Sequence, residues 1–550
     1  MKKIIAVLLI GVSLSTLVGC KKYLDVNKDP DTPQFPDPSS VFPTQLAAIP
    51  RGLQYDARYV SRWVQNFGSA DAGRTADVNW DRMGYASGSD ANGDIWRQAY
   101  YGLGQNLNYI IQEGLKNGQY DYVGAAYALH ALMFQYATDY HGEVIFSEAF
   151  RDQAFFKFDD QEDVYRGIDS LCKIALQYLG RTDGSTTATK LAKGDYVYNG
   201  DLAKWTKFVY GIRARNWHHQ TNKASYNADS VIAFCDKSLA SVNDDFVIPF
   251  DALKNDDANF FGTFRDNLTF MRQTSFIVRL LDGTILAGSK GGDNMDPRIK
   301  HMLTMSADST GTGNGGYRGV DPGIGDPFYG VTTQPNTRRR VSAVWGDSIY
   351  NNPSASNFST NIRKYLFGDK VIMPVMTSSE IQFIKAEAAF RSNKKGLALT
   401  AYTQGINLHF DFINRPSFPR GNNLLFNQNP ISSAERTAYL NSANVKRSEA
   451  TLTLSDIMLQ KYIALWGWGF FETWVDLRRY HYTDLDPQTG LQVYNGFSLP
   501  STLAPENIGK LVYRVRPRFN SEYVWNIEEL RRIGALNSDY HTYETWFSKP

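Results

Sequence analysis

Few residues in this sequence have the types and spacing that enzymes use for chemistry. It contains no G-x-S-x-G elbow, no H-E-x-x-H metal motif and no P-loop. Ser170 and Lys173 match S-x-x-K, but the companion motifs of that hydrolase class are missing. His218 and His219 are adjacent, so on a helix they point about 100° apart and do not favour one shared metal ion. Glycoside hydrolysis needs only two carboxylates at no fixed spacing, so a glycosidase is disfavoured but not excluded.

The clearest chemical signal is a cysteine near the N-terminus. Two lysines precede an apolar stretch over 4–18, which has the layout of a secretory signal peptide and is too short and interrupted to span a membrane. LVGC at 17–20 resembles a bacterial lipobox, in which the cysteine sulfur receives a diacylglyceryl group. Lys21 follows, rather than the aspartate that favours inner-membrane retention in some bacteria. We therefore predict a signal peptide at 1–19 and a lipid anchor on Cys20 in the outer membrane, facing the cell exterior.

Two oxygen-rich turns are candidate calcium sites. The segment 25–31 (DVNKDPD) begins like an EF-hand loop, but Pro30 stands at its sixth position and Pro36 at its twelfth. The segment 90–94 (DANGD) is the second such turn. Turns rich in Asp and Asn occur without metal, so we predict no metal and no cofactor, with calcium as the alternative.

The overall charge excludes one large class of ligand. The chain has 58 basic and 56 acidic side chains, and loss of the two signal-peptide lysines leaves 56 of each. A neutral chain has no electrostatic footprint for nucleic acid. Its 32 Phe, 32 Tyr and 11 Trp residues are compatible with glycan capture, because sugar C–H faces stack on aromatic rings. Cys172 and Cys235 are predicted to be buried thiols, although the sequence leaves a disulfide open.

The first half of the chain is predicted to be a tether followed by helices. Residues 20–45 contain five prolines, which block helix and favour extended structure, so this segment should run from the membrane to the folded body. Helical patterns dominate from Leu46 to about Leu179 and include a helix over 162–179. Another helix is predicted to begin after Asp201, a plausible N-cap, and to run to His219.

The character of the chain then changes twice. Residues 243–372 are rich in Gly, Asp, Asn and Ser and are predicted to form an irregular region with a few short strands. Helices return over 378–392 and 395–412, and this pair resembles a tetratricopeptide unit without a clean repeat. One long helix is predicted over 455–475 and a last one near 526–533.

A series of segments resembles signature pieces of the SusD/RagB family of nutrient-binding outer-membrane lipoproteins. In chain order they are CKKYLDV at 20–26, DYHGEVIFSEA at 139–149, YNGDLAKW at 198–205, IRAR at 212–215, DPR at 296–298, YRG at 317–319, EIQFIKAEAA at 380–389, QKY at 460–462, WVDLRR at 474–479, and YRVRP at 513–517 with Glu522. Each piece alone is weak, but their joint order is specific. His141, Glu143 and Ile145 depart from the family pattern.

The resemblance implies a fold and a partner. The fold would be mostly α, with degenerate tetratricopeptide-like helix pairs, in one domain over 46–540. Its helical scaffold would comprise 46–242 and 373–540, and the irregular region 243–372 would face the ligand. Family members sit as lids over a SusC-like TonB-dependent barrel and deliver glycans or peptides into it.

Most of these signature residues are predicted to hold the fold rather than to do chemistry. Arg478 and Arg479 lie near Trp474 and Asp476 in the sequence and should form buried ion pairs and stacking contacts. Glu387, inside an apolar helix, should accept hydrogen bonds in the core, because a buried charge needs a partner.

Ligand-binding residues are predicted among aromatic side chains in loops, where binding residues concentrate. Polar neighbours that could bond sugar hydroxyls support the choice, although core packing is the more common role for any one of these rings. The candidates are Trp80, Tyr85, Tyr317, Arg318, Tyr329 and Trp345.

The sequence thus predicts a non-catalytic surface lipoprotein that binds a nutrient glycan or peptide and passes it to a SusC-like transporter. Two alternatives stay open. One is a surface glycoside hydrolase with the same anchor, and the other is a structural lid of the transporter with no ligand affinity of its own.

Overall fold

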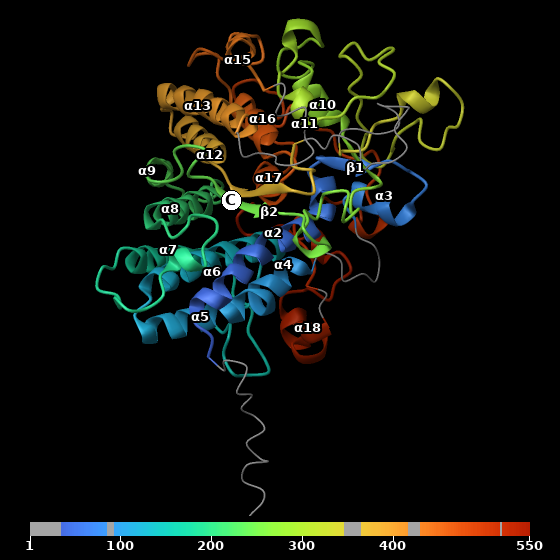
Figure 1. The fold of residues 1–550 in the computed structure, drawn as a ribbon. Coiled ribbons are helices and arrows are strands. Elements are labelled where there is room, and N and C mark those ends of the chain that lie inside the picture. The colour runs from blue at the N-terminus through green and yellow to red at the C-terminus, as the bar shows by residue number, and fades with distance from the viewer. Residues whose placement is uncertain (1–34, 85–92, 346–364, 416–429, 518–519) are drawn as a thin grey trace, which may run out of the picture.

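The computed structural model describes residues 35–84, 93–345, 365–415, 430–517 and 520–550 (Figure 1). The first half of the chain contributes α2 (Pro38–Trp63), α3 (Thr75–Asp81), α4 (Asp94–Arg97), α5 (Gly104–Asn117), α6 (Tyr120–His141), α7 (Gln161–Leu179), α8 (Leu202–His218) and α9 (Ala228–Asp236). The second half contributes α10 (Ser275–Leu281), α11 (Ile299–Met302), α12 (Ser378–Arg391), α13 (Lys395–Ile413), α15 (Ser433–Leu440), α16 (Leu454–Leu465), α17 (Phe470–Arg479), α18 (Asn520–Trp525) and α19 (Ile527–Arg532). The predicted mostly α fold is confirmed.

Two small antiparallel sheets tie the irregular region to the helices. In one, β1 (Phe67–Ser69) pairs with β3 (Met271–Gln273), and Phe67 lies opposite Gln273. In the other, β2 (Phe246–Phe250) pairs with β4 (Val371–Met376), and Phe250 lies opposite Val371. The chain between these strands consists mainly of turns and short helices in its described part, as the glycine-rich composition predicted.

Helix α2 overturns part of the predicted tether. The chain is helical from Pro38, so the extended segment expected as far as residue 45 is wrong in its last part. Pro38 stands at the first helical turn, where a missing N–H is tolerated, and the Asp37 carboxylate accepts a hydrogen bond from the Ser39 N–H at 2.9 Å. Pro43 lies further inside the helix, which is held by burial of Phe42 and Leu46.

Most predicted helices of the scaffold are confirmed. The Asp201 carboxylate caps α8 by accepting from the N–H groups of Ala203 and Lys204. Helices α12 and α13 form the predicted pair of helices joined by a short turn, in which Asn393 has a positive φ of 59°. In Figure 1 the helices α2 and α4–α7 occupy the lower part of the molecule, whereas α12, α13 and α16 occupy the upper part.

The long helix predicted over 455–475 is two helices. Helix α16 ends at Leu465, and α17 begins at Phe470. The break contains Gly467, whose φ of 86° is a left-handed conformation that side chains rarely adopt. The two rings that flank this glycine, Trp466 and Trp468, are buried, so the helix is interrupted where the chain turns inside the core.

Further properties of the described residues bear on function. No helix in the described part of the chain is long and apolar enough to cross a membrane. Among the same residues, no cluster of three or more His, Cys, Asp or Glu side chains could hold a metal ion. The candidate calcium segment 25–31 and residues 90–92 lie outside the described residues. Cys172 and Cys235 are buried and form no disulfide, as predicted.

Candidate functional site

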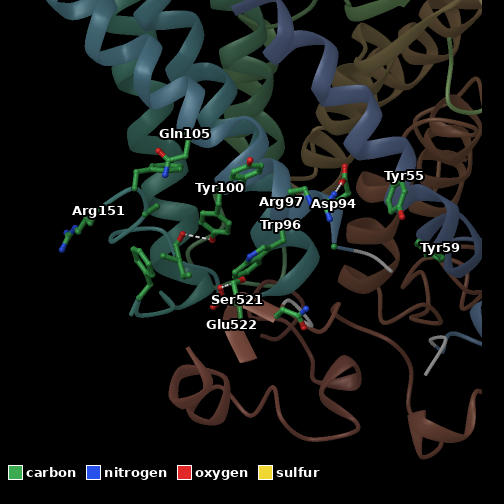
Figure 2. A pocket seen from close by; sticks show the side chains of 17 residues that line it. Tyr55, Tyr59, Asp94, Trp96, Arg97, Tyr100, Gln105, Arg151, Ser521 and Glu522 are labelled. Carbon is green, nitrogen blue, oxygen red and sulfur yellow. Dashed lines mark hydrogen bonds and ion pairs between the residues drawn. The ribbon is translucent and has the colours of Figure 1, made fainter. Parts of the chain in front are cut away.

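An aromatic pocket of about 730 Å³ lies where α2, α4, the 145–156 loop and α18 meet (Figure 2). Its volume falls in the range of small-molecule sites. The residues that line this aromatic pocket are Tyr55, Tyr59, Gly93, Asp94, Trp96, Arg97, Tyr100, Tyr101, Gln105, Ile145, Ala149, Phe150, Arg151, Phe156, Asn520, Ser521 and Glu522. The lining of this one pocket thus combines aromatic rings with hydrogen-bonding groups.

The rings of the aromatic pocket differ in how much surface they present. Tyr101 is 79% exposed and Tyr55 is 40% exposed, so both offer ring faces to a ligand. Trp96 is buried and packs against Tyr100, with ring centroids 4.8 Å apart. The Tyr100 hydroxyl donates to the Ile145 carbonyl oxygen at 2.8 Å, which fixes its ring at the base. The buried rings form a floor, and the exposed tyrosines form the rim.

A π-helical turn places the two consecutive tyrosines. Residues 98–102 follow α4 directly and adopt a π-helix, a rare conformation that occurs often at functional sites. Helix α2 approaches this turn closely at Gly52, where an added Cβ would lie only 2.7 Å from Cγ of Gln98. Because Gly52 has no side chain, α2, which carries Tyr55, can pack closely against the turn that carries Tyr101.

A buried carboxyl group on α2 holds the start of α4. Asp56 is fully buried, and its Oδ2 accepts a hydrogen bond from the Ile95 N–H at 2.8 Å. Burial raises the pKa of Asp56 to about 8, although the Ile95 N–H acts in the opposite direction. The side chain next to Tyr55 therefore fixes the helix from which Trp96 projects.

The opposite wall comes from the C-terminal segment. The Asn526 side chain accepts from the Phe156 N–H at 3.1 Å and donates to the Phe156 carbonyl oxygen at 2.8 Å, which docks α18 on the loop. Asn526 also donates to Glu522 at 3.0 Å. Burial raises the pKa of the Glu522 carboxyl, against the hydrogen bonds from Asn526 and Ser521. Ser521 and Glu522 therefore face the tyrosines from a segment more than four hundred residues away, as the sequence numbering shows.

Two further pockets contain residues singled out from the sequence. A pocket of about 280 Å³ in the irregular region, here called the central pocket, is lined by Tyr317, Arg318, Asn314 and their neighbours. Another, of about 410 Å³, is here called the arginine pocket. It is lined by Arg58, Tyr59, Arg62, Arg74, Trp80, Asp266, Asn267, Thr269, Phe270 and Met271. Tyr59 lines both the arginine pocket and the aromatic pocket, so these two are neighbours.

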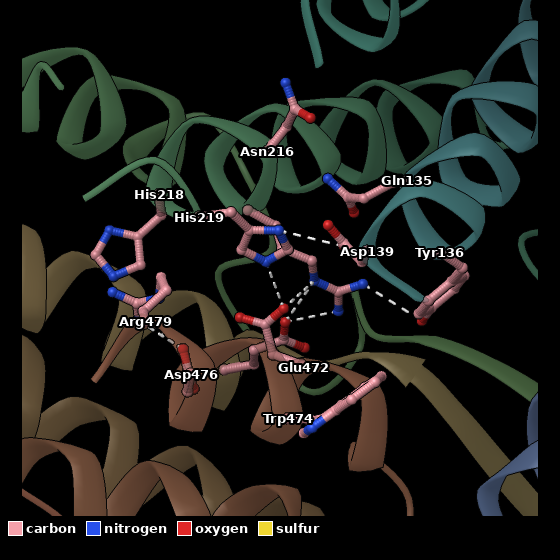
Figure 3. Close-up of polar contacts among 12 residues, drawn as sticks. Gln135, Tyr136, Asp139, Asn216, His218, His219, Glu472, Trp474, Asp476 and Arg479 are labelled. Carbon is pink, nitrogen blue, oxygen red and sulfur yellow. Dashed lines mark hydrogen bonds and ion pairs between the residues drawn. The ribbon is translucent and has the colours of Figure 1, made fainter. Parts of the chain in front are cut away.

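A network of buried charges joins the helices away from these pockets (Figure 3). The Arg479 guanidinium donates to both oxygens of Glu387, at 2.7 and 2.9 Å, and to Asp476 at 2.5 Å. Arg478 stacks on Trp474, with its guanidinium carbon 3.7 Å from the ring centroid, and donates to the Asp139 carbonyl oxygen at 2.6 Å. These contacts confirm the structural roles predicted for both arginines and for Glu387.

The adjacent histidines serve this network in opposite ways. Burial lowers the pKa of His218 to about 4 in spite of the nearby Glu387 carboxylate, which lies 2.8 Å from Nε2. Burial also disfavours the charged form of His219. The carboxylates of Asp139 and Glu472 have the larger effect, however, and raise the pKa of His219 to about 9. One histidine is therefore neutral and the other charged near neutral pH, and the two point to different partners.

Comparison with known proteins decides the family. The sequence profile of a SusD-like family, described as starch-binding and associating with the outer membrane, matches residues 53–503. The chain belongs to this SusD-like family. No curated protein sequence matches it significantly.

Solved structures show the SusD-like fold over nearly the whole chain. A chitin-binding protein superimposes with a TM-score of 0.66 at 20% identity, covering 94% of this chain and 100% of its own. A SusD/RagB family protein from Bacteroides thetaiotaomicron gives 0.63 at 21% identity, with 92% and 98% covered. A chitin-binding SusD homolog from Flavobacterium johnsoniae gives 0.62 at 19% identity, with 93% and 98% covered. At these identities the likeness establishes the fold.

In the SusD-like structure, the ligand-binding residues predicted from the sequence do not come together at one site. Trp80 lies on α3 rather than in a loop, and it is only 4% exposed because it packs on Tyr59 at 4.2 Å. Trp345 is buried, and its indole N–H donates to the Phe261 carbonyl oxygen at 2.7 Å, so no ring face is open to a ligand. Both were expected in accessible loops, and that expectation is wrong.

Of the remaining predicted residues, two line the central pocket. Tyr317 is buried but lines that pocket, and so does Arg318. Tyr329 is half-buried and does not line any of the three pockets named above. Tyr85 and Cys20 lie outside the described residues. The binding roles of Tyr317, Arg318 and Tyr329 stay predictions.

Sequence reasoning missed the aromatic pocket. Its rim residues, Tyr55 and Tyr101, lie on helical segments, whereas the sequence-based prediction favoured aromatic residues in loops. One signal was present: Trp96, Tyr100 and Tyr101 form an aromatic run directly after a Gly/Asp-rich segment. Nothing in the sequence connected that run with Glu522.

Proposed function

We propose that this SusD-like protein binds a glycan in the aromatic pocket without catalysis and delivers it to a SusC-like barrel in the outer membrane. The supporting observation is the rim of exposed Tyr55 and Tyr101 above a fixed floor, with Arg97, Gln105 and Ser521 beside them. Tyrosine faces stack on sugar rings, and the polar side chains can bond sugar hydroxyls. Two of the similar structures are described as chitin-binding, which makes chitin oligosaccharides the first ligands to test.

Replacing the rim tyrosines should weaken glycan binding. We expect Tyr101→Ala and Tyr55→Ala each to cost about 1 kcal/mol, or roughly a fivefold loss of affinity for chitotetraose, because each removes one stacking face. Isothermal titration calorimetry on the full chain in detergent measures the loss. Tyr196→Ala is the matched control, since Tyr196 is 38% exposed and lies outside the aromatic pocket. Equal effects of all three substitutions would contradict the assignment.

The same titrations separate the alternatives. A glycosidase would release shorter sugars, and loss of that release in Glu522→Gln would replace the binding role with catalysis, since Glu522 carries a raised pKa at the pocket wall. A structural lid would bind no saccharide or peptide and yet co-purify with a barrel.

The lipid anchor is proposed on the sequence around Cys20. We expect cells fed an alkyne-tagged fatty acid to label the wild-type protein and not Cys20→Ala, and we expect the variant to leave the membrane fraction, because its acyl chains are lost. Cys172→Ala is the control, since that buried thiol is no lipid acceptor. Equal labelling of Cys20→Ala and wild type would rule out this anchor.

A further inference from the structure

We propose that the arginine pocket recognises an anionic group on the bound glycan, a carboxylate or a sulfate, so that the ligand is an acidic polysaccharide. This inference rests on the proposed glycan binding and extends it to the chemical class of the sugar. It starts from the wall that the arginine pocket and the aromatic pocket share.

The two pockets form neighbouring sections of one surface across α2. Tyr59 lines both of them. The Arg58 guanidinium lies 4.2 Å from the ring centroid of Tyr55, which lines the aromatic pocket, and 5.3 Å from that of Tyr59. A sugar chain that stacks on Tyr55 can therefore place its next residue beside Arg58.

The charges of the arginine pocket favour an anion. The residues that line the arginine pocket include three arginines, Arg58, Arg62 and Arg74, and one carboxylate, that of Asp266. Asp81 lies 3.5 Å from the buried Arg62, which largely balances that pair. Arginine side chains thus outnumber carboxylates among the described residues that line the arginine pocket.

Arg58 is held in a position from which it can bind. Its Nε donates to the Tyr55 carbonyl oxygen at 3.1 Å, and its Nη2 lies 3.4 Å from the Tyr59 hydroxyl. No carboxylate within the described residues forms an ion pair with Arg58. A guanidinium that is oriented by aromatic rings, and whose Nη1 still carries two donors, suits bidentate binding of a carboxylate or sulfate.

The remaining wall suits a sugar ring. Tyr59 and Trp80 lie with ring centroids 4.2 Å apart, and Trp80 packs on Trp63 behind them at 5.9 Å. On the other side, the Arg74 guanidinium lies 3.9 Å from the Phe270 ring centroid. An aromatic wall flanked by two guanidinium groups combines stacking with charge recognition. Trp80 lines the arginine pocket but is only 4% exposed, so the half-buried Tyr59 supplies the ring surface there.

The test compares acidic sugars with neutral counterparts. We would titrate the full chain in detergent with trigalacturonate, its methyl ester and chitotriose, and with a monosulfated galactobiose and its unsulfated form. The acids should bind at least about tenfold more tightly than their neutral forms, and this difference should shrink in high salt. Preference for trigalacturonate identifies a carboxylate ligand, and preference for the sulfated sugar identifies a sulfate ligand.

Substitutions locate the effect. Arg58→Gln and Arg74→Gln should each abolish most of the preference for acids, measured within each variant as the ratio of its affinities for the charged and the neutral form of one sugar. Arg166→Gln on α7, whose side chain is 67% exposed, is the matched control. Thermal unfolding of each variant checks that it is folded, and Arg74, at the exposed start of α3, provides a second test if Arg58→Gln unfolds.

The outcomes distinguish this inference from the proposed function. Equal binding of acid and neutral sugars, or a preference that survives both substitutions, overturns the anionic ligand while glycan binding stands. Absence of binding to every saccharide overturns both. Binding that depends on charge, Arg58 and Arg74 together supports the inference.

Discussion

Arg479→Met is expected to lower the free energy of unfolding by about 3–5 kcal/mol, which is a large fraction of a typical protein's stability. The substitution keeps much of the buried volume but removes the cation that bridges Glu387 and Asp476, both of which are also fully buried. The Glu387 carboxylate would keep donors from Arg391, His218 and Tyr480 but lose the two hydrogen bonds of the fully buried guanidinium. Breaking a buried pair on one side costs more than the pair contributes, because the remaining charge stays desolvated.

Urea unfolding followed by circular dichroism measures this loss. Arg479→Lys should fall between wild type and Arg479→Met, because an ammonium group cannot donate in parallel to two carboxylates as a guanidinium does. Arg166→Met is the control: this arginine pairs with Glu162 and Asp163 on an exposed helix surface, where such pairs contribute at most about 1 kcal/mol. If Arg479→Met and Arg166→Met cost the same, the network is not a main determinant of stability.

The helical scaffold and this network could be predicted from the sequence, because their signals are local or carried by composition. Asp201 stands directly before an apolar helical pattern, and it caps α8 as expected. The sequence predicts an ion pair for Arg479, near Asp476, and hydrogen-bond donors for Glu387, because burial of a charge without a partner is too costly. The partner assignment itself required the structure, because ninety residues separate the two.

The failures have physical causes as well. Prolines in the segment 20–45 indicated extended chain, but a proline in the first turn of a helix costs little, and burial of Phe42 and Leu46 favours continuing the helix. The high content of Gly, Asp and Asn around Trp345 indicated an exposed loop. An irregular segment can still bury a tryptophan when the indole N–H finds a carbonyl oxygen, as that of Trp345 does.

The candidate site could not be predicted because its parts come together only in the folded chain. Tyr55 and Tyr59 line the pocket from α2, whereas Glu522 lies at the other end of the sequence. Residues on a helix that face a cavity look like core residues in the periodicity, since both are apolar and spaced by a turn. Cavity-facing and core residues differ in exposure, which only the structure gives: Tyr101 is 79% exposed and Trp96 is 6% exposed.

The same pocket gives a prediction for the pH dependence of stability, through the buried carboxyl of Asp56. In the unfolded chain this group has an ordinary pKa near 3.8, whereas burial raises the pKa to about 8 in the folded protein. Between these pH values the unfolded state has released its proton and the folded state retains it, so unfolding becomes easier as the pH rises. The contribution of Asp56 to stability is thus greatest below pH 3.8 and is lost by about pH 8.

Asp56→Asn should therefore stabilise the protein at pH 8 by a few kcal/mol, roughly 2 to 4, and change little at pH 4. The amide oxygen can still accept from the Ile95 N–H, so α4 keeps its contact while the ionisable group is gone. Thermal unfolding of variant and wild type at both pH values gives the difference, and Asp163→Asn on the exposed surface of α7 serves as the control. Loss of stability at pH 8 would instead mean that Asp56 is ionised in the folded state and caps α4 as a carboxylate. In that case the contact between Asp56 and α4 would be electrostatic, and glycan affinity should fall in the Asp56→Asn variant.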